Sequence, residues 1–338
     1  MKSRRLIALV LLAVSLAGCA AGIEGEDKAS APIPERLVSE MTSRGMTPAD
    51  PIMVRIYKQE SELEVWKRTH TGTYALLKTY PLCRWSGKLG PKKRQGDRQA
   101  PEGFYAVTPG LMNPRSQFYL AFNLGYPNKL ESALGYEGSA LMVHGACTSS
   151  GCFAMTNNGI AEVYALAREA HSGGQTAIQV QSLPFRMNAQ NLAAYRDDPN
   201  MAFWQNLREG ADYFDVTKQP PVVSACAGRY RFRPTLDGLG TELGPMGPCP
   251  AEDSTPEIAQ RVYEHQAAEN AEVASLALTR PPSSARYVDG GMHQSFRTIL
   301  RKSGPEKLAA MTSGKVEVSR PDAALADPYV QTVASVDQ

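Results

Sequence analysis

The sequence lacks an excess of charge of either sign, since its 338 residues carry 36 Lys and Arg against 34 Asp and Glu, a net charge of +2. A nucleic-acid-binding surface needs concentrated positive charge, so we do not expect nucleic acid as a partner. No internal repeat is evident, and no apolar run beyond the N-terminus is long enough to span a bilayer. The apolar share of 43% allows a core of catalytic-domain size, and the length suggests one or two domains.

The N-terminus combines three basic residues with a short apolar run, Leu6 to Ala17, which is typical of a secretory signal peptide. Leu16 to Cys19 resembles the bacterial lipobox, so we predict a signal over residues 1–18, a lipid on Cys19 and a tether over 19–50. No acidic residue follows the two alanines after Cys19, which favours the outer membrane. The expected location is therefore the periplasm, with membrane attachment through the N-terminal lipid.

A chain outside the cytoplasm is permitted to form disulfides. Besides Cys19 there are five cysteines, and an odd number leaves at least one thiol free: Cys83, Cys147, Cys152, Cys226 and Cys249. Cys226 and Cys249 lie in a segment rich in Gly and Pro and are the best candidates for a disulfide. Cys83 is expected in the core, with pairing to Cys147 as a minor alternative.

Alternation of apolar and polar residues predicts a β-rich region over residues 51–187. The expected strands are a hairpin over 51–69, then 74–84, 103–107, 117–124, 139–143 and 176–183. A long loop over 85–102 is rich in Gly, Pro and charge, and such loops are often functional. One amphipathic helix is expected over 157–171, with Asn157 or Asn158 as its cap. An extension over 188–250 is expected to pack on this region, and a helical, partly disordered tail follows over 251–338.

The stretch HGACTSSGC, from His144 to Cys152, allows three interpretations. A structural zinc site needs four ligands, and His144, Cys147 and Cys152 supply only three without a second pair nearby. A Cys147–Cys152 disulfide is possible but leaves His144 unexplained. In the third interpretation, Cys152 follows a turn of small residues close to a helix N-terminus, which stabilises a thiolate, and His144 serves as its base.

The same stretch resembles the active-site motif of the L,D-transpeptidase (YkuD-like) family, which reads His-Gly, a spacer, then Ser-x-Gly-Cys. Residues 80–107 are similar to the subgroup with a short His-to-Cys spacer, and LPFRM, residues 183–187, resembles its closing strand. The resemblance extends through residues 220–232. It implies a β-sandwich or partly closed barrel with one packed helix, and a catalytic domain over 51–187 without metal or cofactor.

The resemblance also implies residue roles. Cys152 is expected to be the nucleophile and His144 the general base, while Cys147 is expected to be a spacer residue. Gly145, Ser150 and Gly151 are expected to form the turn, with the amides around Gly151 and Cys152 as an oxyanion hole.

Two positions depart from the family pattern. Ser150 stands where many members have histidine, and Ala154 stands where many have an arginine that binds a substrate carboxylate. Substitutes for that arginine are sought among the basic residues of the long loop, which are Arg84, Lys88, Lys92 and Arg98.

The implied activity is acyl transfer on peptidoglycan stem peptides through a thioester on Cys152. Resolution of the thioester by an amine makes a cross-link. Resolution by water makes the protein an amidase, which releases a D-amino acid or a peptidoglycan-attached lipoprotein, the second candidate partner. From another class, the alternative is an envelope lipoprotein that binds peptidoglycan without catalysis.

Overall fold

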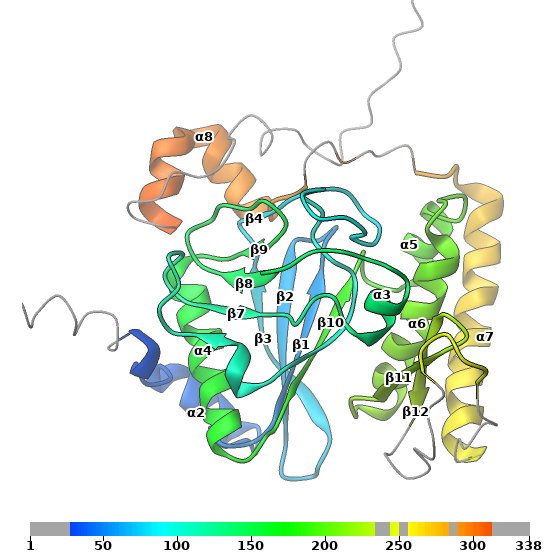
Figure 1. Cartoon of the computed structure of the whole chain (residues 1–338), viewed down its shortest axis with the longest axis horizontal. Coiled ribbons are helices and arrows are strands. Elements are labelled where there is room, and N and C mark those ends of the chain that lie inside the picture. The colour runs from blue at the N-terminus through cyan, green and yellow to red at the C-terminus, as the bar shows by residue number, and fades with distance from the viewer. Residues whose placement is uncertain (1–27, 234–243, 250–255, 284–286, 288–289, 313–338) are drawn as a thin grey trace, which may run out of the picture.

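The computed structural model of the chain describes residues 28–233, 244–249, 256–283, 287 and 290–312. Two five-stranded sheets form the centre of the molecule, and helices pack around them (Figure 1). The predicted mainly β fold of the sandwich type is confirmed, and the sheets do not close into a barrel. The predicted signal peptide and Cys19 lie outside the described residues.

The first sheet, sheet A, has the strand order β3-β2-β1-β10-β5. Its strands are β1 (Ile52–Tyr57), β2 (Glu62–Arg68), β3 (Tyr74–Pro81), β5 (Gly103–Val107) and β10 (Ile178–Leu183). Strand β1 pairs antiparallel with β2 and parallel with β10, and all six of its residues are buried because both faces of the sheet are covered. The predicted hairpin over 51–69 and the predicted strand over 103–107 are confirmed.

The second sheet, sheet B, has the order β4-β9-β8-β7-β6 and is built from shorter strands. These are β4 (Arg84–Trp85), β6 (Met112–Asn113), β7 (Ala121–Asn123), β8 (Met142–His144) and β9 (Phe153–Ala154). The strand predicted over 117–124 is only three residues long, because Tyr119 adopts a left-handed φ of 74° just before it.

The main core lies between the two sheets and helix α4 (Asn157–Ser172). The helix confirms the prediction for 157–171, but its cap is Thr156, whose side chain accepts a hydrogen bond from the Gly159 N–H. Asn157 and Asn158 therefore lie inside the first turn. The face of α4 that carries Ile160, Val163 and Ala167 is buried in this core, as the amphipathic pattern predicts.

Three further short elements border the sheets: α2 (Glu35–Ser43), the 3₁₀ turn η1 (Pro109–Leu111) and α3 (Lys129–Ala133). Helix α2 buries Leu37 and Met41 in the main core. The range predicted as a tether, 19–50, therefore includes a packed helix.

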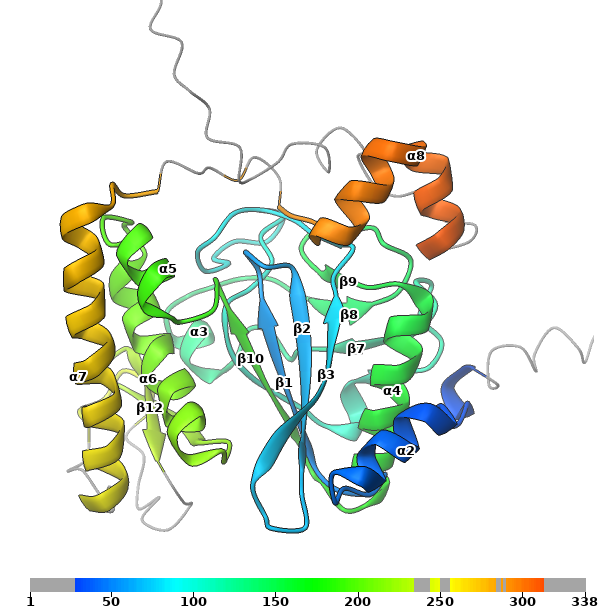
Figure 2. The same cartoon turned by 180° about the vertical axis from the view of Figure 1, so that it is seen from behind.

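After sheet A the chain forms α5 (Ala189–Ala194), α6 (Met201–Thr217), β11 (Val222–Cys226), β12 (Arg229–Arg233), α7 (Pro256–Thr279) and α8 (Gln294–Thr312). The elements α5 to α7, with the hairpin β11–β12, cover the second face of sheet A, whereas α8 lies beside sheet B (Figure 2). A second apolar cluster joins Phe104 of β5 to Phe185 and Trp204 from this extension. Across the described ranges, no helix combines the length and the hydropathy that a membrane span requires.

The described part of the tail is more ordered than the sequence predicts. Arg208 of α6 forms an ion pair of 2.8 Å with Glu269 of α7. Gly291 exchanges backbone hydrogen bonds with Trp85 of β4, and α8 buries Phe296 and Leu300. A few large apolar side chains at helical spacing are enough to dock α8, although the surrounding sequence is polar. Residues 313–338 lie outside the described ranges.

Candidate active site

His144 and Cys152 lie on the same face of sheet B. Strands β8 and β9 are parallel neighbours, and His144 is in register with Ala154. Paired residues on neighbouring strands point to one face, and so do residues two apart along a strand. Cys152, two residues before Ala154, therefore shares the face of His144. His144 and Cys152 come close together because the loop between them returns the chain to the adjacent strand.

Two glycines shape that loop. A Cβ on Gly145 would lie 2.7 Å from the Asn157 side-chain oxygen and 2.8 Å from the Phe118 carbonyl oxygen, so no larger residue fits without a shift. Gly151 has a φ of 134°, a conformation that favours glycine. Ser150, predicted as the third turn residue, is exposed.

The sulfur of Cys152 is held by two backbone groups of the segment that enters β8. The Met142 N–H donates to Sγ at 3.4 Å, and the thiol donates to the Ala140 carbonyl at 3.6 Å. Burial raises the pKa of the Cys152 thiol, while the Met142 N–H and the charge of Lys92 oppose this shift. Cys152 is therefore a neutral thiol at neutral pH. The helix N-terminus, which the sequence suggested as the source of stabilisation, does not supply a donor to Sγ.

His144 is buried and its ring packs against Phe118 at a centroid distance of 4.7 Å. Its Nδ1 lies 2.6 Å from the Gly145 carbonyl oxygen. A carbonyl only accepts, so Nδ1 carries the proton and Nε2 keeps a lone pair. Burial lowers the pKa of His144 to about 4, against a smaller opposing effect of the Gly145 carbonyl. The imidazole is therefore a neutral base at physiological pH.

The amides predicted as the oxyanion hole are bound by a residue that the sequence analysis did not single out. The buried Ser149 Oγ accepts from the Cys152 N–H at 3.2 Å and from the Gly151 N–H at 3.4 Å, and it donates to the Cys152 carbonyl at 2.7 Å. Ser149 is the serine of the Ser-x-Gly-Cys motif, so the motif itself was the available signal.

The remaining cysteines correct one prediction and confirm another. Cys147 forms a disulfide with Cys83, so it is neither a spacer thiol nor a partner of Cys152, and its sulfur is not available as a zinc ligand. The predicted Cys226–Cys249 disulfide is confirmed. Among the described cysteines, Cys152 is the free one.

The Cys83–Cys147 bond joins the loop between His144 and Cys152 to the end of β3. It lies in a buried cluster with Ala154 and with apolar side chains of the C-terminal segment, among them Met292 and Phe296. The disulfide therefore fixes the catalytic loop against two other parts of the chain.

Arg84 lies directly across from Ala154. The two residues are in register in the antiparallel pair β4–β9, so Arg84 shares the face of Ala154, His144 and Cys152. An arginine is thus present on the strand next to the position where many family members carry one. Its side chain is fully buried and donates to the Trp85 carbonyl at 2.9 Å.

The other basic candidates have different surroundings. The side chain of Lys88 is exposed. The carbonyl oxygen of Arg98 accepts from Ser86 Oγ at 2.8 Å, and the Arg98 backbone borders Gly151. Lys92 is buried, forms an ion pair with Asp97 and lies close enough to Cys152 to lower the pKa of its thiol.

A possible metal-ligand group lies on α6 and α7, where Asp212, His265 and Glu269 approach one another. Arg208 forms ion pairs with Asp212 and with Glu269, so a guanidinium already neutralises these carboxylates. This group explains the docking of α7 and is separate from the motif of His144 and Cys152.

Comparison with known proteins agrees with this geometry. A family model described as YkuD, L,D-transpeptidase catalytic domain, matches residues 53–180. The chain is 40% identical over 228 residues to the Escherichia coli K12 protein named "Putative L,D-transpeptidase YafK", covering 67% of this chain and 89% of the relative. The protein of the same name from E. coli O157:H7 matches with the same identity and coverage.

Solved structures give weaker matches. The K307A mutant of the helical cell shape determining protein Pgp2 from Campylobacter jejuni is 22% identical, with a TM-score of 0.33, over 44% of this chain and 54% of that chain. Bd1075 from Bdellovibrio bacteriovorus is 19% identical, with a TM-score of 0.27, over 41% of this chain and 50% of that chain.

Proposed function

Because the chain belongs to the YkuD family of L,D-transpeptidases and is an enzyme of that family, we propose that it transfers an acyl group of a peptidoglycan stem peptide through Cys152. The observation that carries this proposal is the pairing of one free thiol, Cys152, with a neutral imidazole, His144, on the same sheet face. Cys–His pairs are established nucleophile–base pairs.

The reaction begins with a proton transfer. Cys152 turns from the Ala140 carbonyl, and His144 Nε2 accepts the thiol proton as sulfur attacks the carbonyl at the L-centre of a meso-diaminopimelate residue. The C–N bond to the D-amino acid then breaks, and the leaving amine takes the proton from His144. A thioester on Cys152 remains, and the imidazole is again neutral and ready to serve as a base for the second step.

The second step decides between two activities. An amine that attacks the thioester makes a cross-link, and water makes a free carboxylate, as in an amidase that releases a D-amino acid or an attached lipoprotein. We favour transfer, because the chain resembles relatives named for transpeptidation.

The oxyanion of the tetrahedral intermediate is proposed to take the place of Ser149 Oγ at the amides of Gly151 and Cys152. Support comes from the length of the present hydrogen bonds, 3.4 and 3.2 Å, which are weaker than the bonds that an anion would form. Arg84 is proposed to bind the substrate carboxylate, because it lies across from Ala154 on the same face.

The location of the enzyme is proposed from its N-terminal sequence. A signal over 1–18 and a lipid on Cys19 would hold the catalytic domain at the periplasmic side of the outer membrane, next to its substrate. Replacement of Cys19 by serine is expected to move the protein from the membrane fraction to the soluble periplasm. A Cys19→Ser protein that stays with the membrane would contradict the anchor.

The test of the enzyme uses two readouts. Intact mass after incubation with a carbapenem is expected to show one adduct on the wild type and none on Cys152→Ala. A Cys83→Ala/Cys147→Ala double variant is the control and is expected to keep the adduct. Incubation with purified muropeptides, with and without attached lipoprotein, then identifies cross-linked or hydrolysed products by mass. An adduct on Cys152→Ala would overturn the proposed nucleophile.

A further inference from the structure

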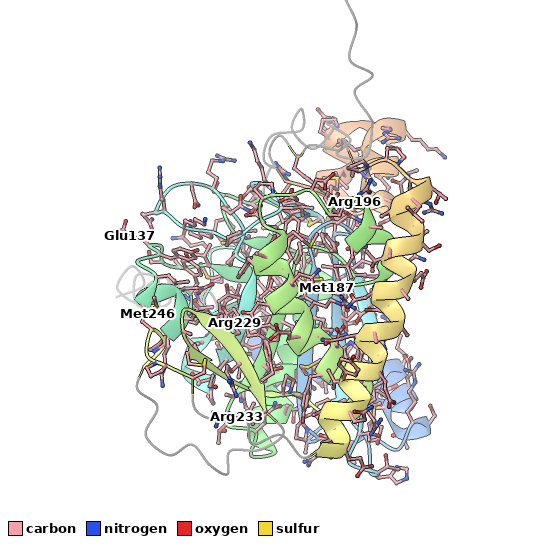
Figure 3. All side chains as sticks on the ribbon, turned by 90° about the vertical axis from the view of Figure 1, so that its right-hand side faces the viewer. Glu137, Met187, Arg196, Arg229, Arg233 and Met246 are labelled. Atoms are coloured by element: carbon pink, nitrogen blue, oxygen red, sulfur yellow. A yellow bond between two sulfur atoms is a disulfide. The ribbon has the colours of Figure 1, made fainter. Side chains whose placement is uncertain are left out.

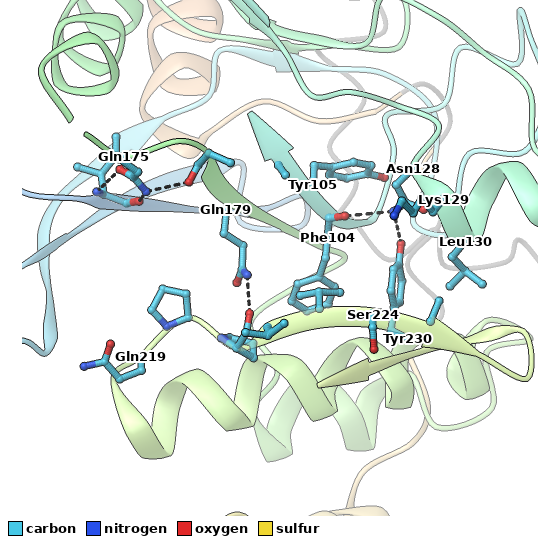
Figure 4. A pocket seen from close by; sticks show the side chains of 18 of the residues that line it. Phe104, Tyr105, Asn128, Lys129, Leu130, Gln175, Gln179, Gln219, Ser224 and Tyr230 are labelled. Atoms are coloured by element: carbon cyan, nitrogen blue, oxygen red, sulfur yellow. Dashed lines mark hydrogen bonds between the residues drawn. The ribbon is translucent and has the colours of Figure 1, made fainter. Parts of the chain in front are cut away.

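A cavity of about 1110 Å³ lies between sheet A and the hairpin β11–β12 (Figure 4). Phe104 and Ala106 of β5 and Gln179 of β10 line its upper side, and Val222 to Ala225 of β11 line its lower side. None of the lining residues belongs to the candidate active site. Gln179 donates to the Pro221 carbonyl at 2.8 Å, so the start of β11 is held at a fixed distance from the sheet.

The outer edge of β11 is the feature that suggests a ligand. The hairpin closes with a two-residue turn, Ala227–Gly228, and both residues have a left-handed φ, 49° and 73°. In such a hairpin the pair next to the closing pair directs its backbone groups outward. That pair is Ala225 with Tyr230, and the backbone of Tyr230 does bind outward, to the side chain of Asn206.

By the same alternation, Val223 and Ala225 direct their N–H and C=O groups toward the outer side of β11. Both residues line the cavity. Within the described ranges, no hydrogen bond reaches these four backbone groups. A strand edge with unpaired groups is a template for another strand, and here both residues of that edge line the cavity.

The walls of the cavity provide side-chain recognition. The ring of Phe104 packs against Tyr230 and Phe232 of β12, at centroid distances of 5.5 and 4.8 Å, and forms an apolar wall with Leu130. Two exposed cations, Arg68 and Lys129, lie at the rim. The described lining includes no Asp or Glu. The site therefore favours a ligand with apolar and acidic side chains.

The site lies on the opposite side of sheet A from the main core. Figure 3 shows the hairpin from the outside, where Arg229 and Arg233 mark the ends of β12. The outer edge of β12 is occupied by α6, because the Tyr230 backbone exchanges hydrogen bonds with the Asn206 side chain. Of the two hairpin strands, β11 is therefore the one whose outer edge can pair with an additional strand.

We propose that this cavity binds an extended, acidic segment of another protein, which adds to β11 as a third strand. Backbone hydrogen bonds to Val223 and Ala225 supply the affinity, and the apolar wall and the two rim cations select the side chains. An all-L polypeptide has the regular alternation of N–H and C=O groups that this edge requires. The inference does not depend on the proposed reaction at Cys152.

The first experiment measures fluorescence anisotropy with capped L-peptides of eight residues that alternate Val and Glu. The acidic peptide is expected to bind, and the matched Val–Lys peptide and the all-D peptide are expected to bind at least tenfold more weakly. N-methylation of either the odd-numbered or the even-numbered residues gives two series of peptides. Only alternate N–H groups of an added strand face β11, so the two series differ in whether these groups are blocked. One series is expected to lose binding and the other to keep it.

The protein side is tested by charge reversal. Lys129→Glu and Arg68→Glu are expected to weaken the binding of the acidic peptide by about threefold to tenfold, because exposed charges contribute modestly to affinity. Lys302→Glu on α8 makes the same charge change on an exposed residue away from the cavity and is expected to leave binding unchanged. The circular dichroism spectrum and the Tm of each variant serve as the test that it is folded.

Four results would overturn the proposal. They are equal binding of the all-D peptide, equal loss of binding with both N-methyl series, saturation by glycan fragments instead of peptide, and peptide binding that begins only after residues 234–243 are replaced by a short linker. The last result would assign the cavity to the chain's own segment. Slower amide exchange at Val223 and Ala225 on peptide addition would support β-strand addition directly.

Discussion

His144 and Cys152 show how burial sets the resting state of a reactive pair. Burial raises the pKa of the thiol and lowers the pKa of the imidazole, so both groups stay neutral between the two values. A thiolate–imidazolium pair needs the opposite shifts. In the proposed reaction the proton therefore moves during the attack on substrate, with His144 acting as a general base.

This resting state predicts that the acylation rate is maintained to an unusually low pH. Carbapenem acylation requires the neutral imidazole, so kcat/KM is expected to fall only below about pH 4, where His144 becomes protonated. Stopped-flow acylation rates across pH measure the midpoint. Phe118→Ala opens the His144 ring to water and is expected to move the midpoint up toward 6.5. A wild-type midpoint already near 6.5 would contradict the buried, neutral histidine.

Arg84 is tested through its proposed ligand. Arg84→Met keeps the length of the side chain and removes the charge, so KM for a stem peptide with a free diaminopimelate carboxylate is expected to rise by about tenfold to a hundredfold. The matched substrate with an amidated carboxylate is expected to show almost no difference between the two enzymes. An equal rise of KM for both substrates would assign Arg84 a structural role only.

The sequence singles out the candidate reactive residues but not their surroundings. The spacing of His144 and Cys152 is local, so this motif is visible without the fold. The register that places Arg84 across from Ala154 depends on pairing between β4 and β9, whose first residues, Arg84 and Phe153, are 69 positions apart, and no local pattern encodes it. The role of Ser149 follows from a turn geometry that only the folded loop defines.

At the scale of elements, the Cys83–Cys147 disulfide fixes the loop that carries the motif. The two cysteines are 64 residues apart, so in the chain-entropy account the bond contributes about 4 kcal/mol to the free energy of unfolding. The Cys83→Ala/Cys147→Ala variant is expected to lose roughly this amount in chemical denaturation, and to acylate about tenfold more slowly because the loop is less constrained.

The second disulfide provides the matched control. Cys226 and Cys249 are 23 residues apart, so removing their bond is expected to cost about 3 kcal/mol by the same account. This bond lies in the extension after sheet A, and the acylation rate is expected to stay unchanged. Equal acylation rates in both double variants would show that the loop does not need the Cys83–Cys147 bond.

The elements that the sequence predicts best are those with a strong local period. The hairpin over 51–69 and helix α4 are of this kind. Helix α2 and the hairpin β11–β12 were not predicted. Helix α2 is short and polar except at Leu37, Val38 and Met41, and β11 follows two prolines. Their stability comes from contacts with distant parts of the chain rather than from their own pattern.

At the scale of the whole molecule, the C-terminal segment returns to the catalytic sheet. Gly290 and Gly291 lie against β4, and a Cβ on Gly290 would lie 1.8 Å from the Trp85 carbonyl oxygen. This contact brings α8 to the disulfide of the catalytic loop. Helix α8 and the candidate active site are therefore parts of one packed unit.

Two glycines with nearly equal φ allow a matched test of the contact between the C-terminal segment and β4. Gly290 has a φ of 75° and Gly304 one of 78°, but a Cβ on Gly304 meets nothing within 4 Å. Both alanine variants place a side chain at a left-handed φ, and only Gly290→Ala also breaks the contact with β4. Gly290→Ala is expected to lower Tm by several degrees more and to speed tryptic cleavage at Arg297 and Arg301. Equal effects would mean that α8 docks without this contact.

The disulfide between Cys83 and Cys147 also affects how the Cys152 thiol reacts with oxidants. If Cys152 is oxidised to a sulfenic acid, a nearby thiol can condense with it to form a disulfide. Cys147 is only five residues away in the sequence. Because Cys147 is already bound to Cys83, it does not act as a resolving thiol. Peroxide reacts with thiolates, and Cys152 rests as a neutral thiol hydrogen-bonded to the Ala140 carbonyl. In this resting state Cys152 is thus protected from oxidation by its neutral thiol, and Cys147 offers it no free thiol for a new disulfide.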